Sequence, residues 1–342
     1  MSSPEVAPEV TVGLGFQSDK TLVDYARLAT AAEELGFDVL SVYGDLYYQP
    51  PIVALVTMAR ATTRVRLGPA CLNPFVLHPV EIAAQIAVLD AASEGRAYLG
   101  LARGSWLEEL GVDQRDVPAA MAEAVTVIDA LLCGRDSGVA GTRFRLPPGA
   151  QLRGLRVPGP VPLLIGAWGP RLAALGGEIA AEVKLGGSSN PSMVRLLRSR
   201  VATGEAAAGR TPGSCSVVVG AVTVVADDRA AARRRARENV AMYLDVVAAL
   251  DPTVDVGEEL LSELHRCIAA GDHARAASLV PDELLSRFAF SGTPEDVAEQ
   301  AATVVEAGAS RVEFGTPHGL SDDEGVQLLG RRVLPALRSL LA

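Results

Sequence analysis

Apolar runs that suit buried parallel strands alternate along the chain with amphipathic stretches that suit helices. Between the runs, apolar residues recur three and four positions apart, as on one face of a helix, for example over 21–35, 52–61, 79–93, 170–180 and 294–307. Eight such strand–helix units predict an α/β fold of the (β/α)8 barrel type. The expected strands cover 9–16, 38–43, 64–70, 96–102, 161–165, 181–185, 216–225 and 311–315.

Two segments interrupt this alternation. Residues near 133–160 are rich in Gly, Pro and Arg and lie between the fourth and fifth expected strands. Residues near 251–292 contain helical stretches and loops before the last strand–helix unit. Insertions at the carboxyl ends of barrel strands often shape a substrate site, although a purely structural excursion is the alternative.

Length and composition set further bounds. A chain of 342 residues could hold two average domains or one barrel with insertions, and the unbroken alternation favours one domain spanning 1–342. A net charge of −10 argues against a nucleic-acid partner. No apolar run is long enough for a membrane span, and the first residues do not resemble a secretion signal, so we expect a cytoplasmic protein. The four cysteines and four histidines show no metal-binding spacing, so no metal is expected.

The stretch RLGPACLNPFVLHP, residues 66–79, is the most informative part of the chain. An apolar strand runs into Ala70 and Cys71, and the prolines that follow break it before a helix begins near Pro79. This pattern predicts an irregular strand end rather than a simple turn. Asn73 could bind a ligand there or fix the loop, and Cys71 could simply be a small core residue.

Other expected strands also end in polar or small residues. Asp45 follows the second strand, where it could bind a ligand or cap a turn. Arg103 and Gly104 follow the fourth strand, and Arg103 could hold an anion or pair with a nearby glutamate. The fifth strand leads into a small-residue turn at a helix N-terminus, where free N–H groups favour a bound anion. This turn consists of Gly166, Ala167, Trp168, Gly169 and Pro170.

These motifs, together with GFDVLSVYGDLYYQPP upstream and VEFGTPHGLSDDEGVQLLGRRVLPAL near the C-terminus, carry a family resemblance. The chain resembles the luciferase-like TIM-barrel oxidoreductases, and within them the methylenetetrahydromethanopterin reductase branch, which uses coenzyme F420. The resemblance implies a strand-end bulge with a non-prolyl cis peptide at Ala70–Cys71 that supports the deazaflavin ring. It also implies that Asp45 meets the polar edge of the ring, that Arg103, Gly104 and the 166–170 turn hold the phosphate, and that a homodimer is possible.

The chain departs from the family pattern at several acidic positions. Gly15 stands where the first strand of the reductase branch carries a glutamate, Leu46 replaces the histidine after the second-strand aspartate, and Ser105 replaces an acid after the fourth strand. Reduction of a double bond usually needs a placed proton source. Tyr47, Tyr48 and Glu108 are candidates for this catalytic role. The tyrosines could equally line an apolar pocket, and Glu108 could pair with Arg103. Water could also serve as the proton source.

The first functional hypothesis is a coenzyme F420-dependent reductase that transfers a hydride between the deazaflavin and a small organic substrate. A C=N bond or a conjugated C=C bond in a biosynthetic pathway is the narrower expectation. An FMN-dependent luciferase-like monooxygenase is the second hypothesis, because the same barrel can serve reduced FMN and oxygen. A barrel that binds a flavin or another ligand without turnover is the third, since the missing acids permit it.

Overall fold

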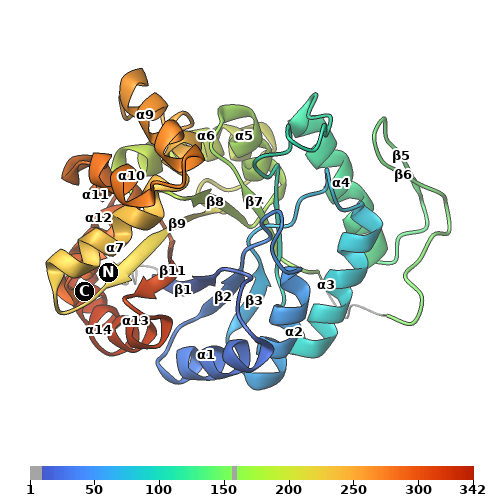
Figure 1. The fold of residues 1–342 in the computed structure, drawn as a ribbon. Coiled ribbons are helices and arrows are strands. Elements are labelled where there is room, and N and C mark those ends of the chain that lie inside the picture. The colour runs from blue at the N-terminus through green and yellow to red at the C-terminus, as the bar shows by residue number, and fades with distance from the viewer. Residues whose placement is uncertain (1–9, 156–159) are drawn as a thin grey trace, which may run out of the picture.

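The computed structural model describes residues 10–155 and 160–342 and contains a ring of eight parallel strands surrounded by helices (Figure 1). The order around the ring is β3-β2-β1-β11-β9-β8-β7-β4, and bridges from Leu67 to Ala97 and from Leu72 to Leu101 join β3 to β4 and close it. The predicted (β/α)8 barrel is therefore confirmed. The strands are β1 (Thr11–Phe16), β2 (Val39–Val42), β3 (Arg66–Pro69), β4 (Leu99–Ala102), β7 (Leu163–Gly166), β8 (Glu182–Gly186), β9 (Ser216–Val225) and β11 (Arg311–Gly319).

Helices follow the strands and form the outer layer of the barrel. Proline stands in the first turn of α2 to α6, where its missing N–H costs no helical hydrogen bond. Thr293 and Asp296 form a capping box at the start of α12. The layer consists of α1 (Leu22–Glu34), α2 (Pro51–Ala61), α3 (Pro79–Ser93), α4 (Val117–Leu132), α5 (Pro170–Ile179), α6 (Pro191–Ala207), α7 (Arg229–Ala241), α12 (Pro294–Glu306), α13 (Asp322–Leu328), the π-helix η1 (Leu329–Val333) and α14 (Leu334–Leu341).

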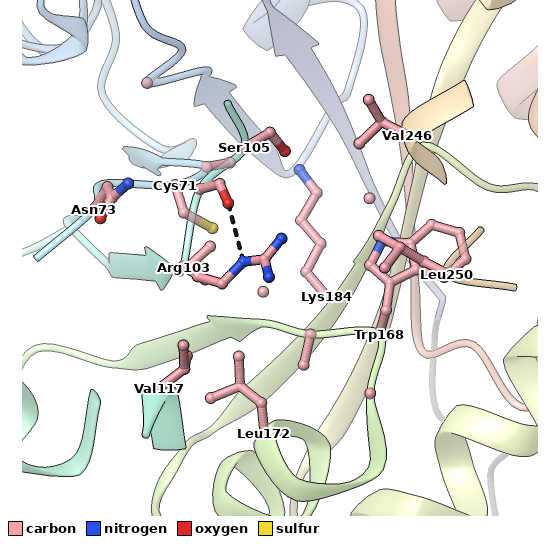
Figure 2. A pocket seen from close by; sticks show the side chains of 18 of the residues that line it. Cys71, Asn73, Arg103, Ser105, Val117, Trp168, Leu172, Lys184, Val246 and Leu250 are labelled. Atoms are coloured by element: carbon pink, nitrogen blue, oxygen red, sulfur yellow. Dashed lines mark hydrogen bonds between the residues drawn. The ribbon is translucent and has the colours of Figure 1, made fainter. Parts of the chain in front are cut away.

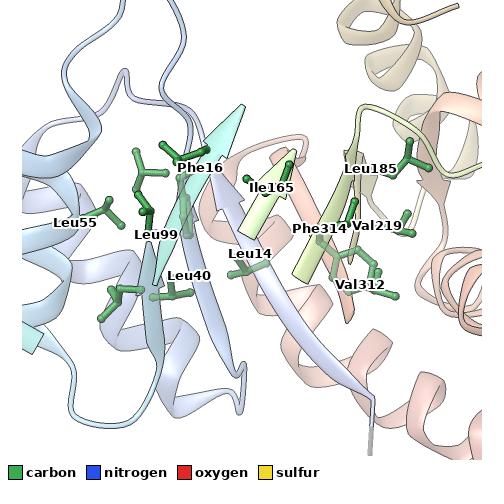
Figure 3. Close-up of a cluster of buried hydrophobic side chains, with 14 of the residues drawn as sticks. Leu14, Phe16, Leu40, Leu55, Leu99, Ile165, Leu185, Val219, Val312 and Phe314 are labelled. Carbon is green, nitrogen blue, oxygen red and sulfur yellow. The ribbon is translucent and has the colours of Figure 1, made fainter. Parts of the chain in front are cut away.

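The two faces of the strands bury different residues. Residues such as Leu14, Leu40 and Phe314 face outward and pack in the main apolar core, part of which Figure 3 shows. The neighbouring positions on each strand face inward because side chains alternate along a strand. A small separate cluster is formed by Val39 of β2, Leu164 of β7, Val218 of β9 and Tyr98, which directly precedes β4. In the ring, β4 and β7 are neighbours, whereas β2 and β9 are separated by β1 and β11, so the cluster joins side chains from both sides of the barrel interior.

Both segments that interrupt the expected alternation carry secondary structure of their own. Residues 133–160 include a small antiparallel hairpin, β5 (Val139–Ala140) and β6 (Arg145–Leu146), which projects beyond α4 (Figure 1). Residues 251–292 hold α9 (Glu258–Ala269), α10 (His273–Leu279), α11 (Asp282–Phe288) and β10 (Ala289–Gly292). The strand β10 was not expected, because its four residues are too few for a recognisable pattern; it pairs with the last residues of β9 outside the ring.

Candidate active site

A cavity of about 550 Å³ opens at the carboxyl ends of the barrel strands. Cavities of this size commonly hold organic ligands or cofactors. The structure brings together here all eleven residues that the sequence predicts for cofactor binding. They are Asp45, Ala70, Cys71, Asn73, Arg103, Gly104, Gly166, Ala167, Trp168, Gly169 and Pro170.

The end of β3 forms one side of the cavity. The peptide bond between Ala70 and Cys71 is cis, at the position where the resemblance places it. Asn73 fixes the following loop, because its side-chain oxygen accepts a hydrogen bond from the backbone N–H of Phe75 at 2.8 Å. The Cys71 thiol packs against Gly100 and Gly166, and burial raises its pKa to about 12 although the nearby charge of Lys184 acts in the opposite direction. A small, neutral and largely apolar surface results.

A cationic region borders the same cavity. The Arg103 side chain is exposed, and its Nε donates to the Gly104 carbonyl at 3.3 Å, as the dashed line in Figure 2 shows. Opposite it, α5 begins at Pro170 without a side-chain cap from Gly169, so the first N–H groups of the helix have no intrahelical partner. Arg200 donates a hydrogen bond to the Trp168 carbonyl and holds this turn in place. The guanidinium and the helix end together suit an anionic group.

Asp45 lies at the mouth of the cavity, with Leu46 beside it. Desolvation raises the pKa of Asp45, and a hydrogen bond from Gln17 together with the charge of Lys184 limits the rise. Ser105 also lines the cavity. Two of the three positions at which the chain departs from the family pattern, Leu46 and Ser105, therefore border the predicted site.

An apolar wall faces the cationic region. It is formed by Val246, Val247 and Leu250, from α8 (Leu244–Ala248) and the turn after it, together with the indole of Trp168. Figure 2 shows Trp168 and Leu250 close together on the side of the view away from Arg103 and Asn73. Such a wall keeps water from one side of the cavity and favours an apolar organic ligand.

The three residues predicted as proton donors lie elsewhere. Tyr47 and Tyr48 are 80% and 51% exposed, and Glu108 is also exposed. None of them belongs to the residues that line the cavity. The backbone turns at Tyr47, where φ is +68°, and this turn carries the loop away from the strand end. Within residues 10–155 and 160–342, no cluster of His, Cys, Asp and Glu could hold a metal ion.

The structure reveals a polar group that sequence reasoning missed. Lys184, from β8, lines the cavity, and its ammonium forms an ion pair with the carboxylate of Glu313, from β11. The side chain of Lys184 is 6% exposed and that of Glu313 is fully buried. Ser41 donates to the other carboxylate oxygen of Glu313 at 2.5 Å and lies 2.7 Å from the Tyr98 hydroxyl. A continuous hydrogen-bonded network therefore runs from the cavity into the barrel.

Glu313 occupies the space beside the missing acid of the first strand. A Cβ atom on Gly15 would lie 2.8 Å from a Glu313 carboxylate oxygen and 2.2 Å from the Tyr43 hydroxyl. A carboxylate is thus present near this position, supplied by β11 instead of β1. Burial opposes ionisation of Glu313, but the charges of Lys184 and Arg311 keep the pKa of its carboxyl below the usual value. The interior therefore holds an ionised pair.

The fold and this site define a class of protein: a (β/α)8 barrel with a cofactor-sized cavity at the carboxyl ends of its strands, where enzymes of this architecture carry their active sites. The chain belongs to the luciferase-like monooxygenase family, whose sequence profile matches residues 6–311. It is 31% identical over 337 residues to a 5,10-methylenetetrahydromethanopterin reductase of Archaeoglobus fulgidus, and the alignment covers 95% of this chain and 99% of that protein.

Other relatives agree with this assignment. An F420-dependent glucose-6-phosphate dehydrogenase of Nakamurella multipartita is 29% identical over 335 residues, covering 93% of each chain. The solved structure of the coenzyme F420-dependent tetrahydromethanopterin reductase of Methanopyrus kandleri superposes with a TM-score of 0.86 at 25% identity, covering 96% of this chain and 99% of that one. These matches confirm the expected family and the expectation of an oxidoreductase. No helix among the described residues is long and apolar enough to cross a membrane.

Proposed function

We propose that this protein is a coenzyme F420-dependent reductase that transfers a hydride between the deazaflavin and a small organic substrate, at a C=N or a conjugated C=C bond. The observation that carries the proposal is the cavity itself, which gathers eleven predicted cofactor residues from the ends of β2, β3, β4 and β7. The named relatives support the choice of cofactor, since they are F420-dependent or belong to the same reductase type.

The residues present fit a deazaflavin. Arg103, Gly104 and the N-terminus of α5 would hold the phosphate, because they supply a cation and free N–H groups. Ala70, Cys71 and Gly166 offer a small, uncharged surface on which a flat ring can lie. The reduced cofactor, when bound, supplies a hydride. The protein then has to orient the substrate, keep water away and provide a proton.

The apolar wall indicates the kind of substrate. Val246, Val247 and Leu250 supply hydrocarbon surface, so a compact and largely apolar molecule is favoured over a sugar phosphate. A cytoplasmic location is part of the proposal, because the four cysteines are free thiols and a reducing compartment keeps them so. A homodimer is likewise a proposal that rests on the family resemblance.

Equilibrium binding of coenzyme F420 and of FMN to the cofactor-free protein tests the proposal. We expect selective binding of F420 at micromolar concentration or below, followed under anaerobic conditions by multiple turnovers with the reduced cofactor and imine or enone substrates. Selective binding of FMN, with substrate hydroxylation in air, would instead establish the monooxygenase alternative. Binding of neither would favour the ligand-binding alternative.

A further inference from the structure

The chain has 31 basic residues, of which 29 are arginines and only two, Lys20 and Lys184, are lysines. The chain therefore uses arginine at every cationic position except Lys20 and Lys184, and Lys184 is the one of these two that lines the cavity. An ammonium can give up a proton to a bound molecule, whereas a guanidinium stays protonated. Lysine at a cavity-lining position thus fits a chemical role better than a purely structural one.

The Lys184 ammonium has hydrogen-bonding capacity to spare. An ammonium carries three N–H groups. Among the described residues, the one hydrogen bond that Nζ donates goes to Glu313. The Tyr43 ring, with its centroid 5.3 Å from Nζ, offers a π-face and no competing acceptor. Figure 2 shows the side chain extending between Arg103 on one side and Trp168 on the other. A ligand in the cavity can therefore accept a hydrogen bond from Nζ.

Buried charges of both signs lie below this site. Arg311 is 1% exposed and lies 3.3 Å from Glu182, and Arg66 lies 3.6 Å from the same carboxylate. The Arg66 side chain is 39% exposed, so solvent screens its charge. Among the largely buried side chains, the cations Lys184 and Arg311 balance the carboxylates Glu313 and Glu182. Among the other groups that face the pair, Tyr43 and Tyr98 have pKa values raised by burial, and so does Cys71. Asp45 also lines the cavity, where its carboxylate interacts with the charge of Lys184.

The Lys184 ammonium at the wall of the cavity affects possible substrates differently. It opposes a second cation, such as the protonated imine that is the reactive form of most C=N substrates. It favours a group on which negative charge develops during reduction, such as the oxygen of a conjugated carbonyl compound. Of the two bond types in the proposed function, these arguments therefore favour the conjugated C=C bond over the C=N bond.

We propose that Lys184 is a catalytic residue and that the substrate is a neutral α,β-unsaturated carbonyl compound whose oxygen accepts a hydrogen bond from Nζ. This inference rests on the proposed function. The hydride forms a C–H bond at the β-carbon, the C=C electron pair moves to join the α-carbon and the carbonyl carbon, and the carbonyl electron pair moves to oxygen. Lys184 gives a proton to this oxygen, and the enol formed becomes the saturated carbonyl compound in water. The substrate is reduced by two electrons, the reduced deazaflavin is oxidised, and solvent returns the proton to Lys184.

Anaerobic kinetics with saturating reduced F420 provide the first test. The paired substrates are 2-cyclohexenone and 2-methyl-1-pyrroline, a small enone and a small cyclic imine. We expect kcat/KM for the enone to exceed that for the imine at least tenfold. Lys184→Met should lower the enone value by about 100-fold or more, as loss of one donor to a developing oxyanion does. Lys184→Arg, which keeps the charge but not the transferable proton, should restore the enone value in part, and Lys20→Met, which removes the other lysine, should have no effect.

A binding measurement without turnover provides the second test. Lys184→Met leaves Glu313 buried without its partner, so the variant K184M/E313Q removes both charges together. We expect the cofactor-free protein to bind the ionised form of 4-cyanophenol more tightly than the neutral form. The ultraviolet absorption of the bound phenol as a function of pH measures this preference. The double variant should bind the phenol without this preference. Equal phenolate binding by both proteins, or faster reduction of the imine, would overturn the inference. Failure of F420 to bind would overturn the proposed function and with it the reduction step, and the phenol measurement would still show whether Lys184 binds an oxyanion.

Discussion

Gly104 and Asn73 approach each other so closely that a Cβ atom on residue 104 would lie 2.1 Å from Asn73 Nδ2. Gly104 also has a φ of +83°, in the left-handed region that side chains disfavour. The two residues come from the loops after β4 and β3, on adjacent strands of the ring. This contact joins the predicted phosphate region to the loop that follows the cis peptide bond.

We therefore expect Gly104→Ala to weaken F420 binding at least tenfold, because Asn73 must move to make room. The fluorescence of the deazaflavin on titration with protein measures the affinity. Gly111→Ala is the matched control, since Gly111 has a φ of +64° but nothing within 4 Å of an added Cβ. It should cost about 1 kcal/mol of stability, with no loss of affinity. Equal effects of the two substitutions would mean that strain alone is responsible.

Arg103→Gln should lower the affinity for F420 by about 10- to 100-fold, because a charge-assisted contact to phosphate is lost. Its effect on a deazaflavin that lacks the phosphate chain should be small, and isothermal titration calorimetry with both ligands measures the difference. Arg115→Gln is the control, because Arg115 is 90% exposed and pairs with Asp113 on the same loop. A similar loss of affinity for both ligands would contradict the assignment of Arg103 to the phosphate.

The crowding at Gly15 predicts a specific double-mutant result. Gly15→Ala should destabilise the protein by about 1–3 kcal/mol, because the added methyl meets the Tyr43 hydroxyl. Combining it with Tyr43→Phe, which removes that hydroxyl, should recover part of the loss. Chemical denaturation of the single and double variants gives the coupling energy. Gly186→Ala, where an added Cβ meets nothing within 4 Å, is the control for stability, and purely additive effects would show that the crowding is absent.

Glu205 makes stability depend on pH. Its carboxylate, which is 1% exposed, accepts hydrogen bonds from the backbone N–H groups of Cys215 at 2.7 Å and Gly213 at 3.1 Å, and pairs with Arg198. Burial opposes ionisation, but these backbone hydrogen bonds and Arg198 hold the pKa of Glu205 below its usual value. Its stabilising effect is therefore present above the pKa of the unfolded chain and is lost as pH falls through the lower folded value.

Glu205→Gln should accordingly reduce the free energy of unfolding at pH 7 by about 2–4 kcal/mol. The difference between variant and wild type should shrink as the pH is lowered below 4.5, which guanidinium denaturation at several pH values would measure. Glu109→Gln, at an exposed position, should change little at any pH. A difference that stays constant down to acidic pH would show that the carboxylate charge is not what stabilises this loop.

Much of the fold and of the cofactor region could be predicted because the signals are local. The run before Ala70 is apolar and the residues after it break a strand, and the turn at 166–170 joins a strand to a proline-led helix. Lys184 and Glu313 could not be found in this way, since they stand 129 positions apart, and each is one of two charged residues in a short expected strand, 181–185 or 311–315. They meet only because β8 and β11 lie on either side of β9.

For the predicted proton donors, the sequence suggested a closeness to the cavity that the structure does not show. Tyr47 and Tyr48 follow Asp45 closely in the sequence, and this proximity makes them natural candidates. Tyr47 has a left-handed backbone conformation, which tyrosine rarely adopts. The direction of the loop was therefore not predictable from the sequence pattern. Distance along the chain was a poor guide to distance from the cavity in this loop.

Apart from Trp168, which belongs to both, the apolar wall of the cavity and the cofactor region come from different parts of the chain. Val246, Val247 and Leu250 belong to the connection between α7 and β10, whereas the predicted cofactor residues follow the ends of β2, β3, β4 and β7. Sequence changes in the connection can therefore reshape the substrate side while the residues around the phosphate stay in place. We therefore expect that exchanging residues 242–252 with those of a relative transfers the choice of substrate and leaves binding of the cofactor unchanged.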